Sequence, residues 1–155
     1  MVENIRVDGL KEVQGALNKV SGIIDTEGRK WLRDWAMYGV RQVQLHTLNS
    51  GAVDTNELIQ GIHYKITGLT ATVQPSDKAA KYAGFVEEGT RPHFPPIKAI
   101  QGWADRHGIP AFLVARKIAR EGTPPRHMWR DAFADVEDKV GSEIADFATA
   151  IVRKI

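Results

Sequence analysis

The chain contains no cysteine, which excludes a disulfide framework, a thiolate metal site and a cysteine nucleophile. No apolar run approaches the roughly 20 residues that span a bilayer, and the opening residues MVENIRVDGL lack the basic and then apolar layout of a signal peptide. We therefore expect assembly in the cytoplasm and no membrane partner. Internal repeats, low-complexity tracts and linkers are also missing, so residues 1–155 are predicted to form a single domain.

Motifs of known chemistry are equally scarce. The sequence has no phosphate-binding glycine loop and no serine nucleophile elbow. Its histidines fall on different predicted elements, without a pair at helical spacing to begin a zinc site. They are His46, His63, His93, His107 and His127. We therefore predict no cofactor and no metal.

The net charge of +2 is small, but the charges are unevenly distributed along the chain. A basic stretch contains Arg116, Lys117, Arg120, Arg126 and Arg130, with Glu121 as its only acid. The next stretch is acidic and contains Asp131, Asp135, Glu137, Asp138, Glu143 and Asp146 beside Lys139. Two interpretations stay open: two solvated helix faces, or one positive and one negative side suited to head-to-tail self-association.

Apolar spacing predicts helices at both ends of the chain. A short helix follows Asp8 as its N-cap and ends before Gly22, and a longer one runs from Asp25 or Thr26 to Leu48. Within the longer helix, an aromatic stripe is predicted to form core or a subunit contact: Trp31, Trp35 and Tyr38. The last helix is predicted to start with Thr123 as N-cap and Pro124 in its first turn. Its apolar seam is Trp129, Phe133, Val136, Val140, Ile144, Phe147 and Ile151.

The middle of the chain predicts strands and short helices. Alternating apolar residues on both sides of Gly68 indicate a β-hairpin. Residues 74–77, QPSD, are predicted to form a turn. The segment YAGFVEEGT is predicted to be a third, shorter strand, or a helical turn leading into one. Two short helices begin after Pro96 and Pro110 and end at Gly108 and Gly122. The predicted fold class is α+β: a long N-terminal helix, a small antiparallel sheet (hairpin plus third strand), short helices and a long C-terminal helix.

The segment FVEEGTRPHFPP, residues 85–96, admits two hypotheses. A hydrolase would use Glu87 or Glu88 with His93, but adjacent residues on a strand point to opposite faces and cannot act together. Alternatively the segment is a rigid docking element, with one glutamate paired to a basic group such as Arg91, Gly89 at positive φ, and prolines stiffening the exit. The basic stretch adds a third hypothesis, a small DNA-binding accessory protein that contacts phosphates without sequence preference.

The pattern YAGFVEEGTRPHFPP, then a Trp-containing helix, then FLVARKIAREGTPPRHMWRDAF, resembles the tail-component family of long-tailed bacteriophages. These are small neck or tail-completion proteins. The resemblance covers about residues 62–133; the helices between Ile97 and Glu121 occur in only part of the family, and RHMW replaces the usual Pro-Phe. The matching positions are Tyr82, Ala83, Val86, Glu87, Gly89, Thr90, Gly122, Thr123, Pro124 and the aromatic position near Met128 and Trp129.

The resemblance implies an α+β virion protein that joins a finished tail to the DNA-filled head. It implies a homo-oligomeric ring around the DNA channel, with six-fold symmetry favoured and twelve-fold as the alternative. The implied neighbours are head-stopper or connector proteins and tail-terminator or tail-tube proteins, with non-specific contact to packaged DNA. The predicted assembly residues are Phe85, Glu87, Gly89, Thr90, Arg91, His93, Arg116, Lys117, Arg120 and Arg126.

Overall fold

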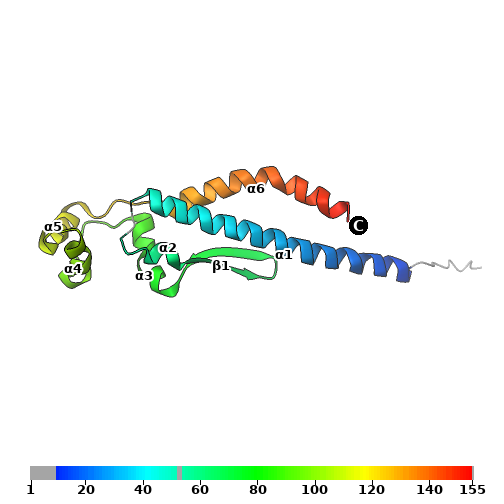
Figure 1. The fold of residues 1–155 in the computed structure, drawn as a ribbon, viewed down its shortest axis with the longest axis horizontal. Helices are drawn as coiled ribbons and strands as arrows, with labels where there is room; N and C mark the ends of the chain where they lie inside the picture. Colours follow the sequence, from blue (N-terminus) through cyan, green and yellow to red (C-terminus); the bar gives the residue numbers. More distant parts are fainter. Residues whose placement is uncertain (1–9, 52–53, 155) are drawn as a thin grey trace, which may run out of the picture.

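The structure, a computed structural model, describes residues 10–51 and 54–154. It is mostly helical and elongated, with two long helices lying side by side and a small β-hairpin against them (Figure 1). Helices α4 (Ile97–Arg106) and α5 (Ala111–Glu121) form a separate helical arm at one end. The predicted α+β class, with long helices near both ends of the chain, is confirmed.

A single helix, α1 (Leu10–Asn49), replaces the two N-terminal helices that we predicted. The predicted break at Gly22 is wrong because an isolated glycine costs a helix only about 1 kcal/mol and does not end it. The predicted N-cap Asp8 lies outside the described residues. The other end is as predicted, since the helix ends at Asn49, followed by Gly51 at positive φ.

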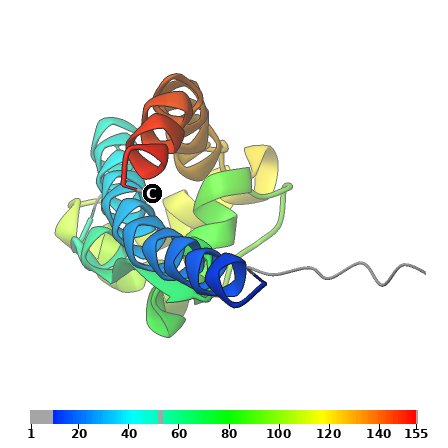
Figure 2. The same cartoon turned by 90° about the vertical axis from the view of Figure 1, so that its right-hand side faces the viewer.

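Helix α6 (Met128–Val152) lies along α1, and the end-on view shows the two helices adjacent to each other (Figure 2). The aromatic stripe of α1, predicted to form core or a subunit contact, is partly buried, and its Trp31 ring stacks on Phe147 of α6 at 4.9 Å between centroids. Most of the predicted α6 seam is half-buried, but Phe133 and Ile144 stay 40% and 55% exposed. Near the end of α6, Lys154 pairs with Glu27 of α1. The N-terminal part of α1, drawn in blue, extends beyond the end of α6 (Figure 1).

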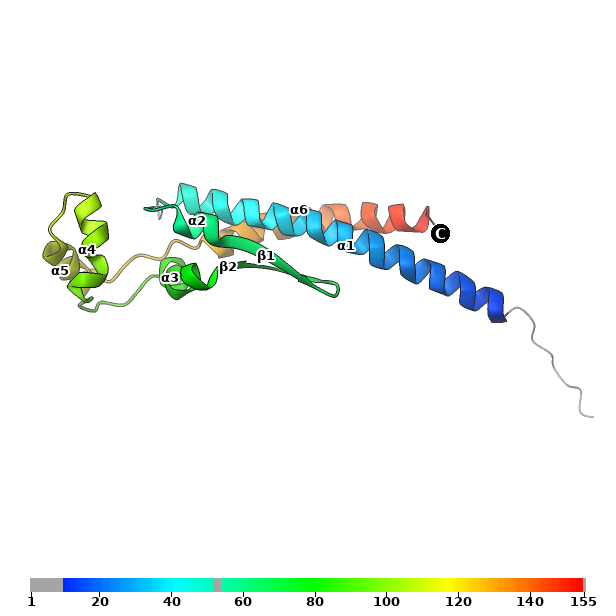
Figure 3. The same cartoon turned by 60° about the horizontal axis from the view of Figure 1, so that its bottom comes forward.

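The β-hairpin forms as predicted. Strand β1 (Ile62–Thr67) pairs antiparallel with β2 (Thr70–Pro75), with Tyr64 opposite Val73 and the turn at Gly68. The hairpin lies along α1 (Figure 3). Close approach is possible because α1 carries Gly39 here, where a Cβ would lie only 3.2 Å from Cγ2 of Val73. A short helix that the sequence did not predict, α2 (Glu57–Gly61), precedes β1.

A third strand does not form, because the sheet of the described residues has two strands. The alternative prediction, a helical turn leading into an extended segment, is closer: most of YAGFVEEGT belongs to helix α3 (Asp77–Glu88), and Thr90 forms an isolated bridge. Aromatic and β-branched residues favoured the strand prediction. Burial at helical spacing decides the outcome, because Ala79 and Ala83 are buried and Tyr82 and Val86 pack beside them. The predicted turn at 74–77 contains the helix start, where the Ser76 hydroxyl accepts a hydrogen bond from the Ala79 backbone N–H.

Helices α4 and α5 begin after Pro96 and Pro110, as predicted, and α5 ends at Gly122. The predicted start of the last helix is wrong, because α6 begins at Met128 and Thr123 does not cap it. Residues 122–127 instead run as a connecting segment from α5 to α6 (Figure 1).

Two small cores hold together α1, α2, α3, the β-hairpin and α6, which are called the body below. One contains Leu58 of α2, Ala79 and Ala83 of α3 and Met128, the first residue of α6. The other joins α1, β1 and α6 through Val43, Ile62 and Ala132. The arm contributes to neither core. The beginning of α6 is therefore the point where the body's elements meet.

Replacing Met128 by alanine should lower the free energy of unfolding by about 2–5 kcal/mol, because the fully buried side chain leaves a cavity between α2, α3 and α6. Denaturant unfolding followed by circular dichroism measures this change. Met37→Ala is the matched control: Met37 is 48% exposed on α1 and should change stability by no more than about 0.5 kcal/mol. Equal losses for both variants would contradict the assigned core.

Candidate assembly interface

The helical arm is connected to the rest of the chain by two segments, residues 88–92 and 121–125, which pair with each other and are called the joint below. Thr90 and Thr123 form an isolated antiparallel bridge. The Thr90 N–H donates to the Thr123 carbonyl at 3.0 Å, and the Thr123 N–H donates to the Thr90 carbonyl at 3.1 Å. Their hydroxyl oxygens are 3.0 Å apart, within hydrogen-bond distance. The arm is thus fastened at its base by backbone and side-chain hydrogen bonds.

The two segments of the joint have nearly the same sequence, EGTRP at 88–92 and EGTPP at 121–125. Each begins at a helix end, continues with a glycine at positive φ and places its threonine in the bridge. The duplicated EGT was the available sequence signal for the joint.

Glycine is required at both positions of the joint. Gly89 has φ 70° and ψ −172°, and Gly122 has φ 72° and ψ −158°, a backbone region that is essentially restricted to glycine. A Cβ on Gly89 would lie 2.4 Å from the Thr123 carbonyl oxygen, and one on Gly122 would lie 2.0 Å from the Thr90 carbonyl oxygen. The predicted positive φ at Gly89 is confirmed.

Glu87 caps the start of α6. Its carboxylate accepts the backbone N–H groups of Trp129 and Arg130, each at 3.0 Å. The residue before α6, His127, makes no side-chain cap, so this glutamate from the end of α3 supplies it. Its negative charge also suits the positive end of the helix dipole. The predicted pairing of a glutamate with Arg91 is replaced by this contact; the absence of Ser, Thr, Asp or Asn immediately before α6 was the sequence signal for an outside cap.

A second contact, an ion pair between Arg106 and Asp54, connects the arm to the residues before α2. The Arg106 guanidinium of α4 donates to the Asp54 carboxylate, with Nε 3.0 Å from Oδ1. This hydrogen bond holds the pKa of Asp54 below its ordinary value. A lowered carboxyl pKa means that the ion pair contributes at neutral pH and is lost as the pH falls through the lowered pKa. Because the pair is largely exposed, its contribution to stability is small.

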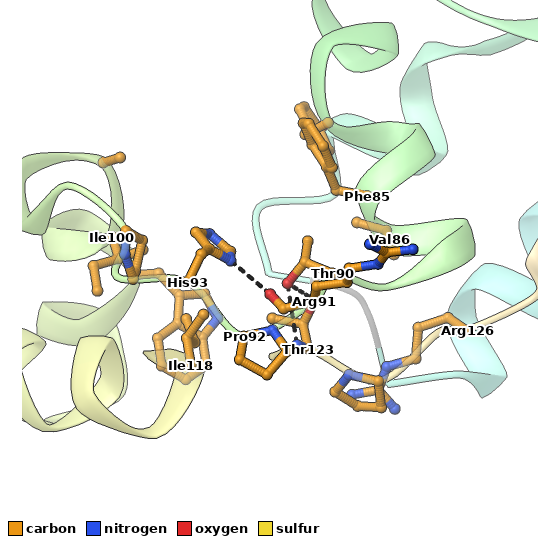
Figure 4. A pocket seen from close by; sticks show the side chains of 15 residues that line it. Phe85, Val86, Thr90, Arg91, Pro92, His93, Ile100, Ile118, Thr123 and Arg126 are labelled. Carbon is orange, nitrogen blue, oxygen red and sulfur yellow. Dashed lines mark hydrogen bonds between the residues drawn. The ribbon is translucent and has the colours of Figure 1, made fainter. Parts of the chain in front are cut away.

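A mainly apolar groove of about 910 Å³ separates the arm from α3 (Figure 4). Phe85 and Val86 of α3 form one side, Ile100 and Ile118 of the arm the other, and Thr90 to Pro92 lie between them. Five predicted assembly residues meet at this groove, namely Phe85, Thr90, Arg91, His93 and Arg126. Phe85 is 64% exposed at the groove edge, which leaves apolar surface open to solvent.

The other predicted assembly residues divide into two groups. Glu87 and Gly89 are not among the residues that line the groove; they build the joint behind it. Arg116, Lys117 and Arg120 are exposed on α5. Arg126 connects both regions, because its backbone N–H donates to the carbonyls of Val86 and Glu87 while its guanidinium donates to the Ser50 carbonyl at 2.8 Å.

The glutamates and His93 do not form a common chemical centre. The Glu87 carboxylate is occupied at the start of α6, and Glu88 is exposed and absent from the groove lining. The Nδ1 of His93 donates to the Arg91 carbonyl at 2.9 Å. Across residues 10–51 and 54–154, no group of three or more His, Asp or Glu side chains could hold a metal ion. In the same part of the chain, no helix combines the length and apolar character needed to cross a membrane.

A comparison of the chain with protein-family models, curated proteins and solved structures found no match. The candidate interface therefore rests on the geometry of the joint, the groove and the exposed face of α5.

Gly89→Val should damage folding or assembly more than His93→Ala, because the valine Cβ would collide with the Thr123 carbonyl. We expect a loss of at least about 1–3 kcal/mol from backbone strain, against about 1 kcal/mol for the exposed histidine. Denaturant unfolding measures both. Gly84→Ala is the matched control, since no atom lies within 4 Å of its added Cβ and alanine favours a helix. Equal tolerance of Gly89→Val and His93→Ala would count against the joint.

Glu87→Ala should destabilise the protein by about 1–2 kcal/mol, because the first turn of α6 loses its cap. Glu88→Ala removes an exposed carboxylate from the neighbouring position and should change stability by less than about 0.5 kcal/mol. Amide hydrogen exchange at Trp129 and Arg130 gives a local measure: only the Glu87 variant should exchange faster there. Unchanged exchange in that variant would refute the cap.

Proposed function

We propose that this chain is a structural subunit of the neck of a long-tailed bacteriophage, where it helps to complete the tail and join it to the head. Six copies around the DNA channel are favoured, with twelve as the alternative. Its partners are head-stopper or connector proteins on one side and tail-terminator or tail-tube proteins on the other. It is assembled in the host cytoplasm and resides in the virion.

The observation that carries this proposal is the convergence of the two parts of the family-like pattern. Gly89 and Thr90 belong to the first part and Gly122 and Thr123 to the second, 33 residues later, yet the two threonines pair with each other. The resemblance therefore falls on residues that fix backbone geometry, not on a set of reactive side chains. Such a pattern suits a protein that presents a shaped surface.

The surface of the arm also supports a role in an assembly. Phe94, Phe112 and Leu113 are 56%, 57% and 48% exposed. The Phe94 ring, from the segment before α4, lies 6.4 Å from the Phe112 ring of α5 between centroids. An arm of this size buries mainly small side chains, Ala104, Ala111 and Ala115. Exposed large apolar residues on a small protruding unit are typical of a surface that contacts another protein.

Non-specific contact with DNA is the second candidate function. The exposed side of α5 presents Arg116, Lys117 and Arg120, and phosphate attraction needs no more than such a cluster. In a ring around a DNA channel, this role is compatible with the first.

Deleting the coding gene from the phage should leave DNA-filled heads and separate tails, because the joining subunit is missing. Electron microscopy of the lysate distinguishes joined from unjoined particles. Supplying the gene from a plasmid should restore joined particles and infectivity, whereas supplying the Gly89→Val variant should not. Fully joined, infectious particles in the deletion strain would refute the proposed function.

A further inference from the structure

The exposed side of α5 combines two large apolar residues with three cations. Phe112, Leu113, Arg116, Lys117 and Arg120 are spaced so that they share one side of the helix, called the α5 face. The opposite side packs against α4 and contains the buried Ala111 and Ala115. Among the described residues, no ion pair involves Arg116 or Lys117, and Arg120 pairs with its own neighbour Glu121. The α5 face thus presents positive charge that its own fold leaves largely unneutralised.

Helix α6 presents a surface of the opposite charge, negative, on its solvent side. Two acids, Glu137 and Asp138, are exposed there and belong to no ion pair between described residues. The next residue in sequence, Lys139, lies over the Tyr38 ring of α1, 4.5 Å from its centroid, and so points toward α1. Small residues lie on the same side of α6, three or four positions apart. We call this side the α6 face; its exposed residues are Ala134, Glu137, Asp138, Gly141, Ala145 and Ala148.

The two faces match in charge and in size. Cations on α5 correspond to acids on α6, and the bulky Phe112 and Leu113 correspond to the small Gly141, Ala145 and Ala148. On α5 the apolar pair precedes the cations, while on α6 the acids precede the small residues. Both correspondences hold at once only if the two helices run in opposite directions. The pattern therefore specifies an antiparallel contact between the two helices.

One copy of the chain does not bring the faces together. The arm lies beyond the start of α6, at the end of the molecule (Figure 1). Asp138 lies ten residues into α6, which is about 15 Å along the helix from Met128. The α5 face points outward from the arm, and the joint and the Arg106–Asp54 ion pair fix the arm to the body. A second copy can supply the missing partner for each face.

We propose that the α5 face of one copy docks antiparallel on the α6 face of the next copy. Because the two faces differ, each copy keeps one face available after the first contact, so the association is heterologous and adds further copies. Arg116, Lys117 and Arg120 meet Glu137 and Asp138, which sets the direction of docking. This inference deepens the proposed function by naming the surfaces that join neighbouring subunits, and it rests on that function for its place in a virion.

The absence of native cysteine makes cross-linking a direct test. Lys117→Cys in a chain with a long tag is mixed with Asp138→Cys in a chain with a short tag, and disulfides are formed by mild oxidation. The expected product is the mixed dimer, in clear excess over dimers of either chain with itself. A chain carrying both cysteines should give a ladder of multimers. Lys65→Cys, exposed on the β-hairpin, replaces Lys117→Cys as the matched control and should give only background.

Charge reversal tests the electrostatic part of the contact. Arg116→Glu with Arg120→Glu on the Lys117→Cys chain should reduce the mixed dimer roughly tenfold, because like charges then face each other. Glu137→Lys on the Asp138→Cys chain should restore much of it. About 1 M salt, where the screening length is near 3 Å, should weaken the original pair. A yield of mixed dimer at background level, or a yield that neither charge reversal changes, would overturn the proposal.

Two further outcomes separate this inference from the proposed function and from DNA binding. If gene deletion blocks joining but the mixed dimer never forms, the docking surfaces are wrong and the neck function stands. If the mixed dimer forms but deletion leaves intact particles, the neck function fails and the contact stands. Salt-sensitive DNA binding that is lost with Arg116→Glu and Arg120→Glu, without any mixed dimer, assigns the α5 face to nucleic acid and overturns the docking contact.

Discussion

The pairing of Thr90 with Thr123 is the interaction on which the rest of this structure depends. Two backbone hydrogen bonds of 3.0 and 3.1 Å join segments that are 33 residues apart in sequence. They fix where the arm leaves the body, and the residues just before and after them reach into the body. Glu87 caps α6 and the Arg126 N–H donates to the end of α3. The direction of the arm and the start of the last helix are thus determined at one place.

Local patterns in the sequence predicted the parts of the fold that depend on local forces. The β-hairpin follows from strict alternation around Gly68, and α4 and α5 follow from Pro96 and Pro110 at their starts. The α6 seam was recognisable because its apolar residues recur over many turns. Gly22 misled the prediction of α1, since a glycine without a true C-cap geometry only weakens a helix.

The remaining features depend on contacts between distant residues. The segment containing Phe85 and Val86 has strand-favouring side chains, and its helix is supported by the Ser76 cap and by packing of Ala79 and Ala83 in one core with Leu58 of α2 and Met128 of α6. The same limit applies to the candidate site. The sequence predicted that one of Glu87 and Glu88 pairs with a basic group, but the carboxylate of Glu87 instead accepts the backbone N–H groups of Trp129 and Arg130, 42 and 43 residues later. The cluster of cations on α5 was visible in the sequence, and the structure adds that Arg116, Lys117 and Arg120 are exposed in this chain.

The geometry of the joint has a consequence for how this architecture can change over time. The outgoing and returning segments of the arm pair at the Thr90–Thr123 bridge, so their backbones lie only about 5 Å apart there. A chain that lacked residues 91–122 would have to bridge only that short gap to preserve α3, α6 and the capping carboxylate between them. The arm is therefore placed as a module that could be removed or exchanged at a single short connection, without a change in the chain path of α3 and α6.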